Sequence, residues 1–198
     1  MNPFENKNEF DDRIFKQITL ESDLVSAKRF YDCTFTGCSF RETAFQDCLF
    51  DDCLFLDCDL TMIMVEGCSF KNTRFEKSKV IGVDWTFASW SGIQLQPPLS
   101  FLACSLDYAT FIGLELPKIS FKDCSLKDVE FTEAGLSGAD FSGSVLAKSR
   151  FHHTTLRGAN FVGAVDYFID LTQNDAAGAK FSMPEAVSLL YALDIELV

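Results

Sequence analysis

Large apolar residues recur at every fifth position along most of the chain. From Phe10 to Leu95, each fifth residue is Phe, Leu, Val or Trp. After a slip of one residue within residues 96–100, the same pattern runs from Phe101 to Phe161. A period of five matches neither an α-helix, with about 3.6 residues per turn, nor a flat strand, with about two. It predicts a chain that turns a corner every five residues.

The residue two places before each large apolar residue is usually small. Cys33 and Cys38 are examples in the first half of the chain, and Ala109 and Ala134 in the second. The three other positions of each five-residue unit are mostly polar. Each unit therefore points two side chains inward and three outward, which predicts a solenoid with a narrow, filled interior.

The spacing of like residues indicates how many sides one turn has. Phe and Leu alternate strictly from Phe101 to Phe161, which requires an even number of sides if like residues stack on like. Every cysteine also has a partner twenty residues away, as Cys38 has in Cys58. We therefore predict an all-β solenoid with four five-residue sides per turn. Its expected core includes Phe40, Phe45, Phe50, Phe55, Phe121, Phe141, Cys38 and Cys58.

The length and pattern indicate one domain in three parts. The expected parts are a flexible N-terminus at residues 1–9, the coil at residues 10–181, and a C-terminal helix and tail at residues 182–198.

Two stretches should interrupt the coil. The slip at residues 96–100 contains Pro97 and Pro98, which cannot donate to a strand ladder, so it forms either a bulged corner or a short protruding loop. Residues 162–180 should form an irregular turn, because Asp166 falls at a core position where an unpaired carboxylate would be costly.

The C-terminal segment predicts a short helix over residues 183–193. Ser182 and Glu185 have the spacing of a capping box, and Pro184 suits the first turn. A helix here would cover the open end of the coil, which would otherwise expose a sheet edge. Its apolar residues allow two interpretations, a cap alone or a cap that also joins two copies as a dimer. The residues expected to serve as cap or dimer contact are Leu189, Leu190, Leu193, Ile195 and Leu197.

The charge of the chain limits its partners. The formal net charge is −12, so neither nucleic acid nor an anionic membrane is expected as a direct ligand, and a basic protein surface suits it better. The N-terminal residues lack the basic and apolar regions of a secretory signal, and no apolar run reaches the length of a membrane helix. We therefore expect a cytoplasmic protein with reduced thiols.

The residues that most often carry chemistry are not arranged for it. Successive cysteines on one turn would lie on different sides of the coil and could not converge on a metal ion. His152 and His153 directly follow a core position and should face solvent. We expect no catalytic residues, no metal and no cofactor, and so no enzyme.

Acidic residues concentrate between Glu42 and Phe70, a stretch without Lys or Arg. Its seven carboxylates are those of Glu42, Asp47, Asp51, Asp52, Asp57, Asp59 and Glu66. Four of them, each two places after a core residue, should ring one turn of the coil. They could simply keep a stacked rod soluble. Alternatively, they could form a surface for a partner that normally holds DNA phosphate.

Two short stretches resemble a known repeat. The sequences AGLSG and ADFSG at 134–143, and RGANF at 157–161, resemble the A-(D/N)-L-x-x unit of the pentapeptide-repeat family. This resemblance implies a right-handed quadrilateral parallel β-helix.

The C-terminal sequence YFIDLTQNDAAGAKFSMPEAVSLLYALDIEL, at 167–197, resembles the tail of Qnr-type quinolone-resistance and microcin-immunity proteins. The resemblance implies a non-enzymatic, dimeric acidic rod that imitates duplex DNA, binds DNA gyrase and topoisomerase IV, and shields them from poisons. It maps the dimer contacts onto Leu189, Leu190, Leu193 and Ile195.

Qnr-type proteins also carry projecting loops on which protection depends. In this chain the only candidate is QLQPPLS at 94–100, which is barely longer than a corner. Binding without protection is therefore an alternative, as is a structural or interaction scaffold for another partner.

Overall fold

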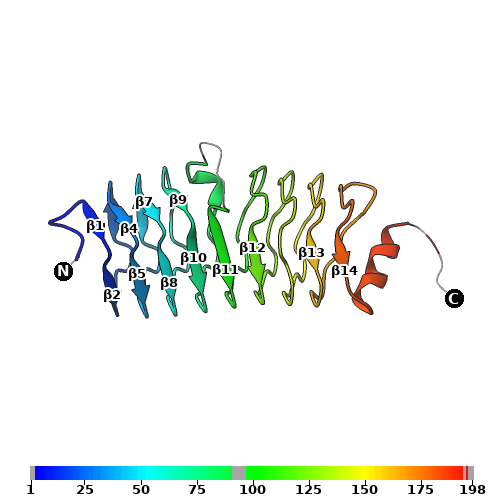
Figure 1. Ribbon diagram of the computed structural model, residues 1–198, viewed down its shortest axis with the longest axis horizontal. Helices are drawn as coiled ribbons and strands as arrows, with labels where there is room; N and C mark the ends of the chain where they lie inside the picture. The colour runs from blue at the N-terminus through cyan, green and yellow to red at the C-terminus, as the bar shows by residue number, and fades with distance from the viewer. Residues whose placement is uncertain (1–2, 91–96, 194, 196–198) are drawn as a thin grey trace.

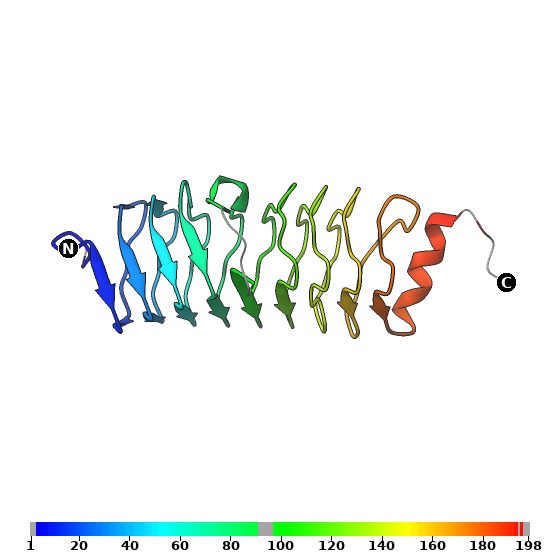
Figure 2. The same ribbon diagram turned by 45° about the horizontal axis from the view of Figure 1, so that its top comes forward.

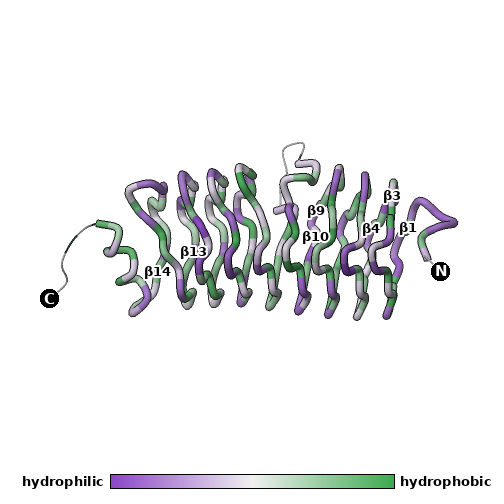
Figure 3. Tube along the Cα trace, turned by 180° about the vertical axis from the view of Figure 1, so that it is seen from behind, coloured by the Kyte–Doolittle hydropathy of each residue, from purple (hydrophilic) through white to green (hydrophobic). Residues whose placement is uncertain are grey.

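The chain winds into a straight rod with its two ends at opposite tips (Figure 1). The computed structural model describes residues 3–90, 97–193 and 195. Short strands stack along the sides of the rod, and a helical segment lies across the C-terminal tip (Figure 2). Apolar and polar residues alternate along each turn of the backbone, as the five-residue pattern predicts (Figure 3).

The regular elements are short because every side of the coil has only five residues. The strands are β1 (Glu9–Asp11), β2 (Ile14–Lys16), β3 (Leu24–Ser26), β4 (Arg29–Tyr31), β5 (Thr34–Thr36), β6 (Ala44–Gln46), β7 (Leu49–Asp51), β8 (Leu54–Leu56), β9 (Ser69–Lys71), β10 (Thr73–Glu76), β11 (Leu99–Leu102), β12 (Ser120–Lys122), β13 (Asn160–Phe161) and β14 (Lys180–Phe181). Two 3₁₀ segments, η1 (Trp85–Phe87) and η2 (Glu185–Leu193), complete the set.

Strand pairing confirms the four-sided coil. All paired strands are parallel, with β1, β4, β7 and β9 on one side and β2, β5, β8, β10, β11 and β12 on the next. Phe35 lies opposite Phe55, twenty residues later. The Asp59 amide donates to the carbonyl of Cys38 at 2.8 Å, which places Cys38 and Cys58 on adjacent turns.

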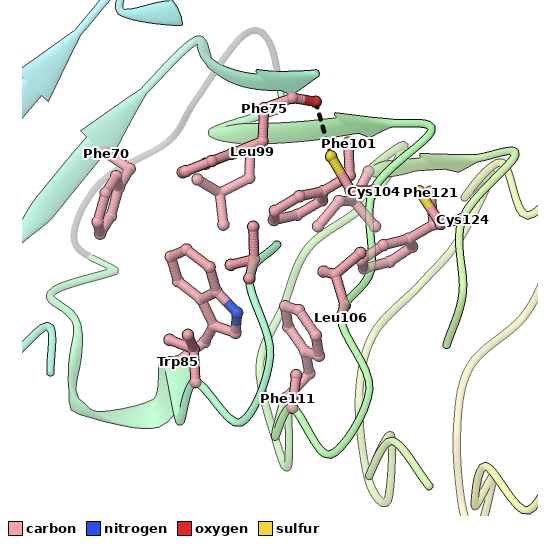
Figure 4. Packing of buried hydrophobic residues seen from close by; sticks show 14 of the residues in the cluster. Phe70, Phe75, Trp85, Leu99, Phe101, Cys104, Leu106, Phe111, Phe121 and Cys124 are labelled. Carbon is pink, nitrogen blue, oxygen red and sulfur yellow. Dashed lines mark hydrogen bonds between the residues drawn. The ribbon is translucent and has the colours of Figure 1, made fainter. Parts of the chain in front are cut away.

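Aromatic rings fill the axis of the coil in stacked columns. The ring of Phe55 lies 4.6 Å from that of Phe35 and 4.9 Å from that of Phe75, nearly parallel to both. Phe101 continues the column at 5.0 Å from Phe75 (Figure 4). Rings on neighbouring sides meet edge to face, as Phe50 and Phe55 do. Both arrangements are favourable for aromatic quadrupoles, so the narrow interior is closely packed.

Where the residue two places before a core residue is Cys, Ser or Thr, its side chain usually donates to a carbonyl of the preceding turn. The Cys58 thiol donates to the carbonyl of Phe35 at 3.4 Å, and the Cys104 thiol to that of Phe75 at 3.3 Å (Figure 4). The Thr73 hydroxyl makes the equivalent bond. The pKa of Cys58 is raised, mainly by a hydrogen bond with the Cys38 thiol and secondly by burial. All eight cysteines are buried and free, and they act as small donors in the core.

The one-residue slip in the five-residue pattern corresponds to an insertion of six residues in one turn. Phe75 lies opposite Phe101, which is 26 rather than twenty residues later. The coil therefore keeps its register by adding six residues between Trp90 and Phe101. Leu99 takes the small inward position before Phe101 and is fully buried. Residues 91–96, and with them the choice between a corner and a loop, lie outside the described residues.

The N-terminal segment differs from the flexible end that the sequence predicts. Phe4 is fully buried, and its ring meets those of Phe10, Phe15 and Phe30 edge to face at 5.3–5.6 Å. Residues 3–9 therefore fold back to close the first turn, because an open end would expose this stack of rings to water.

The last turn is irregular, as predicted. Asp166 is exposed, with a left-handed φ of 60°, while Tyr167 and Ile169 are buried in its place. Ala176 and Phe181 return to the five-residue pattern and pack against the core. Shifting the apolar side chains by a residue thus avoids burying the carboxylate.

The predicted C-terminal helix is present as η2. The two residues predicted to form the capping box accept hydrogen bonds from the coil. Ser182 Oγ accepts from the Gly163 amide at 2.9 Å, and Glu185 Oε1 accepts from the Asp166 amide at 2.7 Å. Leu189 is buried against the core. The segment therefore satisfies amides at the open end of the last turn and covers its apolar interior.

We expect the ring columns to carry much of the stability. Replacing Phe55, which is buried between two stacked rings, by Ala should lower the free energy of unfolding by about 3–5 kcal/mol. The control Ile14→Ala, at a residue 66% exposed, should cost about 0.5 kcal/mol or less. Urea unfolding followed by circular dichroism measures both. Equal losses would contradict the stacked core.

Candidate partner-binding surface

Most corners of the coil are made by a residue in the left-handed conformation, while the corner after Trp85 is the 3₁₀ segment η1. The left-handed residue stands two places after the large core residue, and its φ is 55° at Glu42 and 52° at Asp52. Gly and Asp supply many of these corners. Left-handed backbone is unfavourable for most side chains, but Gly, Asp and Asn tolerate it. The fold itself thus favours aspartate at corners, a structural reason for much of the acidity.

Four of the predicted binding residues occupy the four corners of one turn. They are exposed, and they are Glu42, Asp47, Asp52 and Asp57. Because successive corners point in different directions, one partner surface cannot contact all four at once. The predicted ring exists, but it does not form a single face.

The other three predicted residues differ in their availability. Asp51 pairs with Lys71 at 3.5 Å, and Asp59 pairs with Arg41 at 3.3 Å. Burial acts to raise the pKa of Asp59, but hydrogen bonds from Thr61 and from the Arg41 guanidinium outweigh it and lower the pKa below its usual value. These two carboxylates are therefore partly neutralised.

Glu66 is exposed and lies on another side of the coil from Asp52. With the four corner residues, it makes five exposed carboxylates in the predicted set of seven.

A longitudinal row of aspartates is the arrangement that the sequence interpretation missed. Asp12, Asp32 and Asp52 occupy the same corner on three successive turns, and all three are exposed. Asp11 and Asp51 stand next to the first and last of them. No described residue forms an ion pair with Asp12, Asp32 or Asp52. We call these five residues the acidic stripe. Their twenty-residue spacing was the signal that could have revealed them.

The stripe has a charge spacing of the same order as that of DNA. Parallel strands lie about 4.8 Å apart, so a corner repeats at about that interval along the rod. One DNA strand carries a phosphate about every 3.4 Å of helix axis. A single corner of aspartates thus supplies roughly two thirds of the linear charge density of a strand.

The structure contains no evident chemical site in its described part. There, no group of three or more His, Cys, Asp and Glu side chains is placed to hold a metal ion. His152 and His153 are both exposed, with ring centroids 4.0 Å apart. Among the same residues, no helix combines the length and apolar character that a bilayer crossing needs.

The C-terminal tip divides the predicted dimer residues into two groups. Leu189 and Leu190 face the coil to different extents, buried and half-buried respectively. Leu193 and Ile195 are 41% and 52% exposed. Leu197 lies outside the described residues. Among the described residues of the predicted dimer contact, Leu193 and Ile195 therefore offer the most apolar area to another molecule.

Comparison with known proteins identifies the repeat. A model described as a pentapeptide repeat region matches residues 28–97 and 83–161. The chain belongs to this pentapeptide-repeat family. Its right-handed quadrilateral β-helix is the fold of that family. No curated protein sequence matches the chain.

Among solved structures, the fold is similar to that of QnrB1, a plasmid-mediated fluoroquinolone resistance protein. A trypsin-treated variant of QnrB1 has a TM-score of 0.71 at 20% identity, covering 96% of this chain and 98% of that one. Full-length QnrB1 has a TM-score of 0.58 at 20% identity, covering 92% and 100% respectively. At this identity the likeness shows the pentapeptide-repeat fold alone.

The corner conformation makes a direct prediction about Asp52. Asp52→Gly should change the free energy of unfolding by less than about 0.5 kcal/mol, because glycine accepts the left-handed backbone. Asp52→Val should cost about 1–2 kcal/mol, because a β-branched side chain does not. The control Asp51→Val lies in strand β7 and should cost less. If Val is tolerated equally at both positions, the corner does not select the residue.

Proposed function

We propose that this protein is a non-enzymatic DNA mimic that binds a type II topoisomerase, DNA gyrase or topoisomerase IV, through its acidic side. Bound in this way, the rod would occupy a basic surface that otherwise holds duplex DNA, and could protect the enzyme from quinolone-like or microcin-like poisons. The observation that carries the proposal is the acidic stripe.

Three features support this proposal. Three carboxylates of the stripe, those of Asp12, Asp32 and Asp52, are exposed at intervals comparable to those of phosphates, on a rigid rod of net charge −12. A rigid surface loses little conformational entropy when it binds, so little of the favourable electrostatic free energy is spent on ordering side chains. The fold is also similar to that of QnrB1, a fluoroquinolone resistance protein.

The competing function is an interaction scaffold with a different partner. The observation that favours it is the left-handed corner, since the fold would select aspartate there without any partner. The two functions differ in whether gyrase responds to the protein and whether the response depends on the stripe.

A supercoiling assay with purified gyrase tests the proposal. We expect the protein at micromolar concentration either to inhibit supercoiling or to restore it in the presence of a fluoroquinolone. Asp32→Lys combined with Asp52→Lys should weaken the effect by about tenfold or more, because it reverses two charges of the acidic stripe. Lysine is compatible with these corners, since Lys77 and Lys118 already occupy equivalent ones.

The matched control is Asp123→Lys combined with Asp128→Lys, which makes the same charge change at two corners farther along the rod. It should weaken the effect much less, and circular dichroism should show that both variants keep the wild-type fold. No effect of the wild-type protein on gyrase, together with no co-purification, would overturn the proposal in favour of the scaffold. Equal loss in both variants would mean that only the net charge matters.

We further propose that two copies join through the C-terminal tip. The exposed side chains of Leu193 and Ile195 would meet their counterparts about a two-fold axis and become buried. Such a dimer would double the length of the acidic rod.

Light scattering after gel filtration tests the dimer. Leu193→Glu combined with Ile195→Glu should convert the dimer to monomer, because it buries like charges at the axis. The control Ile14→Glu combined with Ile112→Glu changes residues on the sides of the rod and should leave the mass unchanged. A monomeric wild-type protein, or a dimeric tip variant, would contradict this arrangement.

A further inference from the structure

An apolar groove with an acidic rim runs along another corner of the rod. Its apolar side chains are those of Leu24, Met62, Met64 and Phe87, which are 59%, 53%, 54% and 62% exposed. We call it the methionine groove. Single exposed apolar residues are common on soluble proteins, but a contiguous group marks an interaction surface.

Two hollows make up the groove. One, of about 230 Å³, has Met62, Met64 and Phe87 in its lining and the buried Ile63 and Val65 as its floor. The other, of about 460 Å³, continues past the two methionines towards Leu24. Because Met62 and Met64 line both, the two hollows adjoin each other along successive turns.

The backbone at Gly82 helps to shape the groove. A β-carbon there would lie 2.5 Å from the sulfur of Met62, so this thioether rests directly over the glycine. Methionine is flexible and polarisable, and surfaces rich in it adapt to varied apolar partners. The groove thus has movable walls on a rigid coil.

The rim of the groove carries charge of one sign. Asp23 and Glu42 line the larger hollow, while Glu66 and Asp84 line the smaller one. No Lys or Arg is among the described residues of either lining. Duplex DNA or another acidic molecule would be repelled here, and a segment with both apolar and basic side chains would be complementary.

The backbone of the groove is already fully engaged between turns. The amide of Ala44 donates to the carbonyl of Asp23 at 2.8 Å, and that of Met64 to the carbonyl of Thr43 at 3.1 Å. An occupant therefore cannot add as another strand and must bind through side chains. The turn spacing of about 4.8 Å is close to the rise between residues three or four apart on an α-helix, about 4.5–6 Å.

We propose that the methionine groove binds a basic amphipathic helix of a protein partner. Apolar residues three, four and seven places apart on that helix would lie against Met62, Met64 and Phe87, and flanking Lys or Arg side chains would pair with Glu42 and Glu66. The groove and the acidic stripe are ten residues apart in each turn, so they lie at diagonal corners. This proposal does not require the partner to be a topoisomerase.

Nuclear magnetic resonance with ¹³C-methyl methionine tests the site directly. The probe is a synthetic amphipathic helix of Leu, Ala and Lys, added to the full-length protein. The methyl signals of Met62 and Met64 should shift as the peptide is added, whereas that of Met183, 73% exposed near the C-terminal tip, should stay. Signals of Met62 and Met64 that do not move would overturn the proposal.

Fluorescence anisotropy with the same peptide measures affinity. Met62→Asn combined with Met64→Thr should weaken binding by about tenfold or more. The control is Ile14→Asn combined with Leu102→Thr, which removes exposed apolar side chains from β2 and β11, on another side of the coil. It should bind the peptide as the wild-type protein does. Equal loss in both variants would place the peptide elsewhere.

Two altered peptides separate the apolar and the charged parts of recognition. Replacing Leu by Ser should abolish binding, because the apolar contact is lost, and replacing Lys by Glu should abolish it through repulsion from the rim. If the Ser peptide binds equally well, the contact is only electrostatic and the groove proposal fails. It also fails if the methionine variant alters the sedimentation of the protein alone, since a second copy would then cover the groove.

Discussion

The rod depends on a constant register between turns. A ring such as Phe55 can stack on Phe35 and Phe75 only if each turn returns the chain to the same point after twenty residues. The same register aligns the hydrogen bonds between turns and places core donors such as Cys58 and Thr73 within reach of a carbonyl of the preceding turn. The turn that ends at Phe101 is six residues longer, and Phe101 still lies opposite Phe75. Stacking and hydrogen bonding therefore restrict variation to the outside of the coil.

The corners link the fold to the surface charge. A left-handed residue follows most sides, and Gly, Asp and Asn adopt this conformation at little cost. Aspartates thus repeat at structural intervals, as in the stripe of Asp12, Asp32 and Asp52. Function can use this repeat, because the left-handed conformation favours Gly, Asp and Asn at a corner but also accommodates several other residues. Lys77 and Met62 show that freedom, and they give neighbouring corners different chemistry.

Both ends of the coil are covered, so its sides offer most of the surface for binding partners. Phe4 covers the first turn, while Ser182, Glu185 and Leu189 cover the last. The main-chain groups along the sides bond between turns, which leaves only side chains for binding partners. The acidic stripe suits a surface that holds phosphate, and the methionine groove suits an apolar and basic segment. Their diagonal positions would allow both to be occupied together.

The five-residue period by itself determined the solenoid, its four sides, the buried columns and the irregular turn at Asp166, because each follows from local periodicity and the cost of burying charge. The same period, counted over twenty residues, could have revealed the acidic stripe. The tertiary structure alone decided the rest. Phe4 and Ser182 act through contacts with distant turns, which no local pattern encodes. The twenty-residue count also aligns Leu24, Ala44 and Met64, but it does not show that the side chains of Met62, Met64 and Phe87 leave a hollow between them, because side-chain packing decides this.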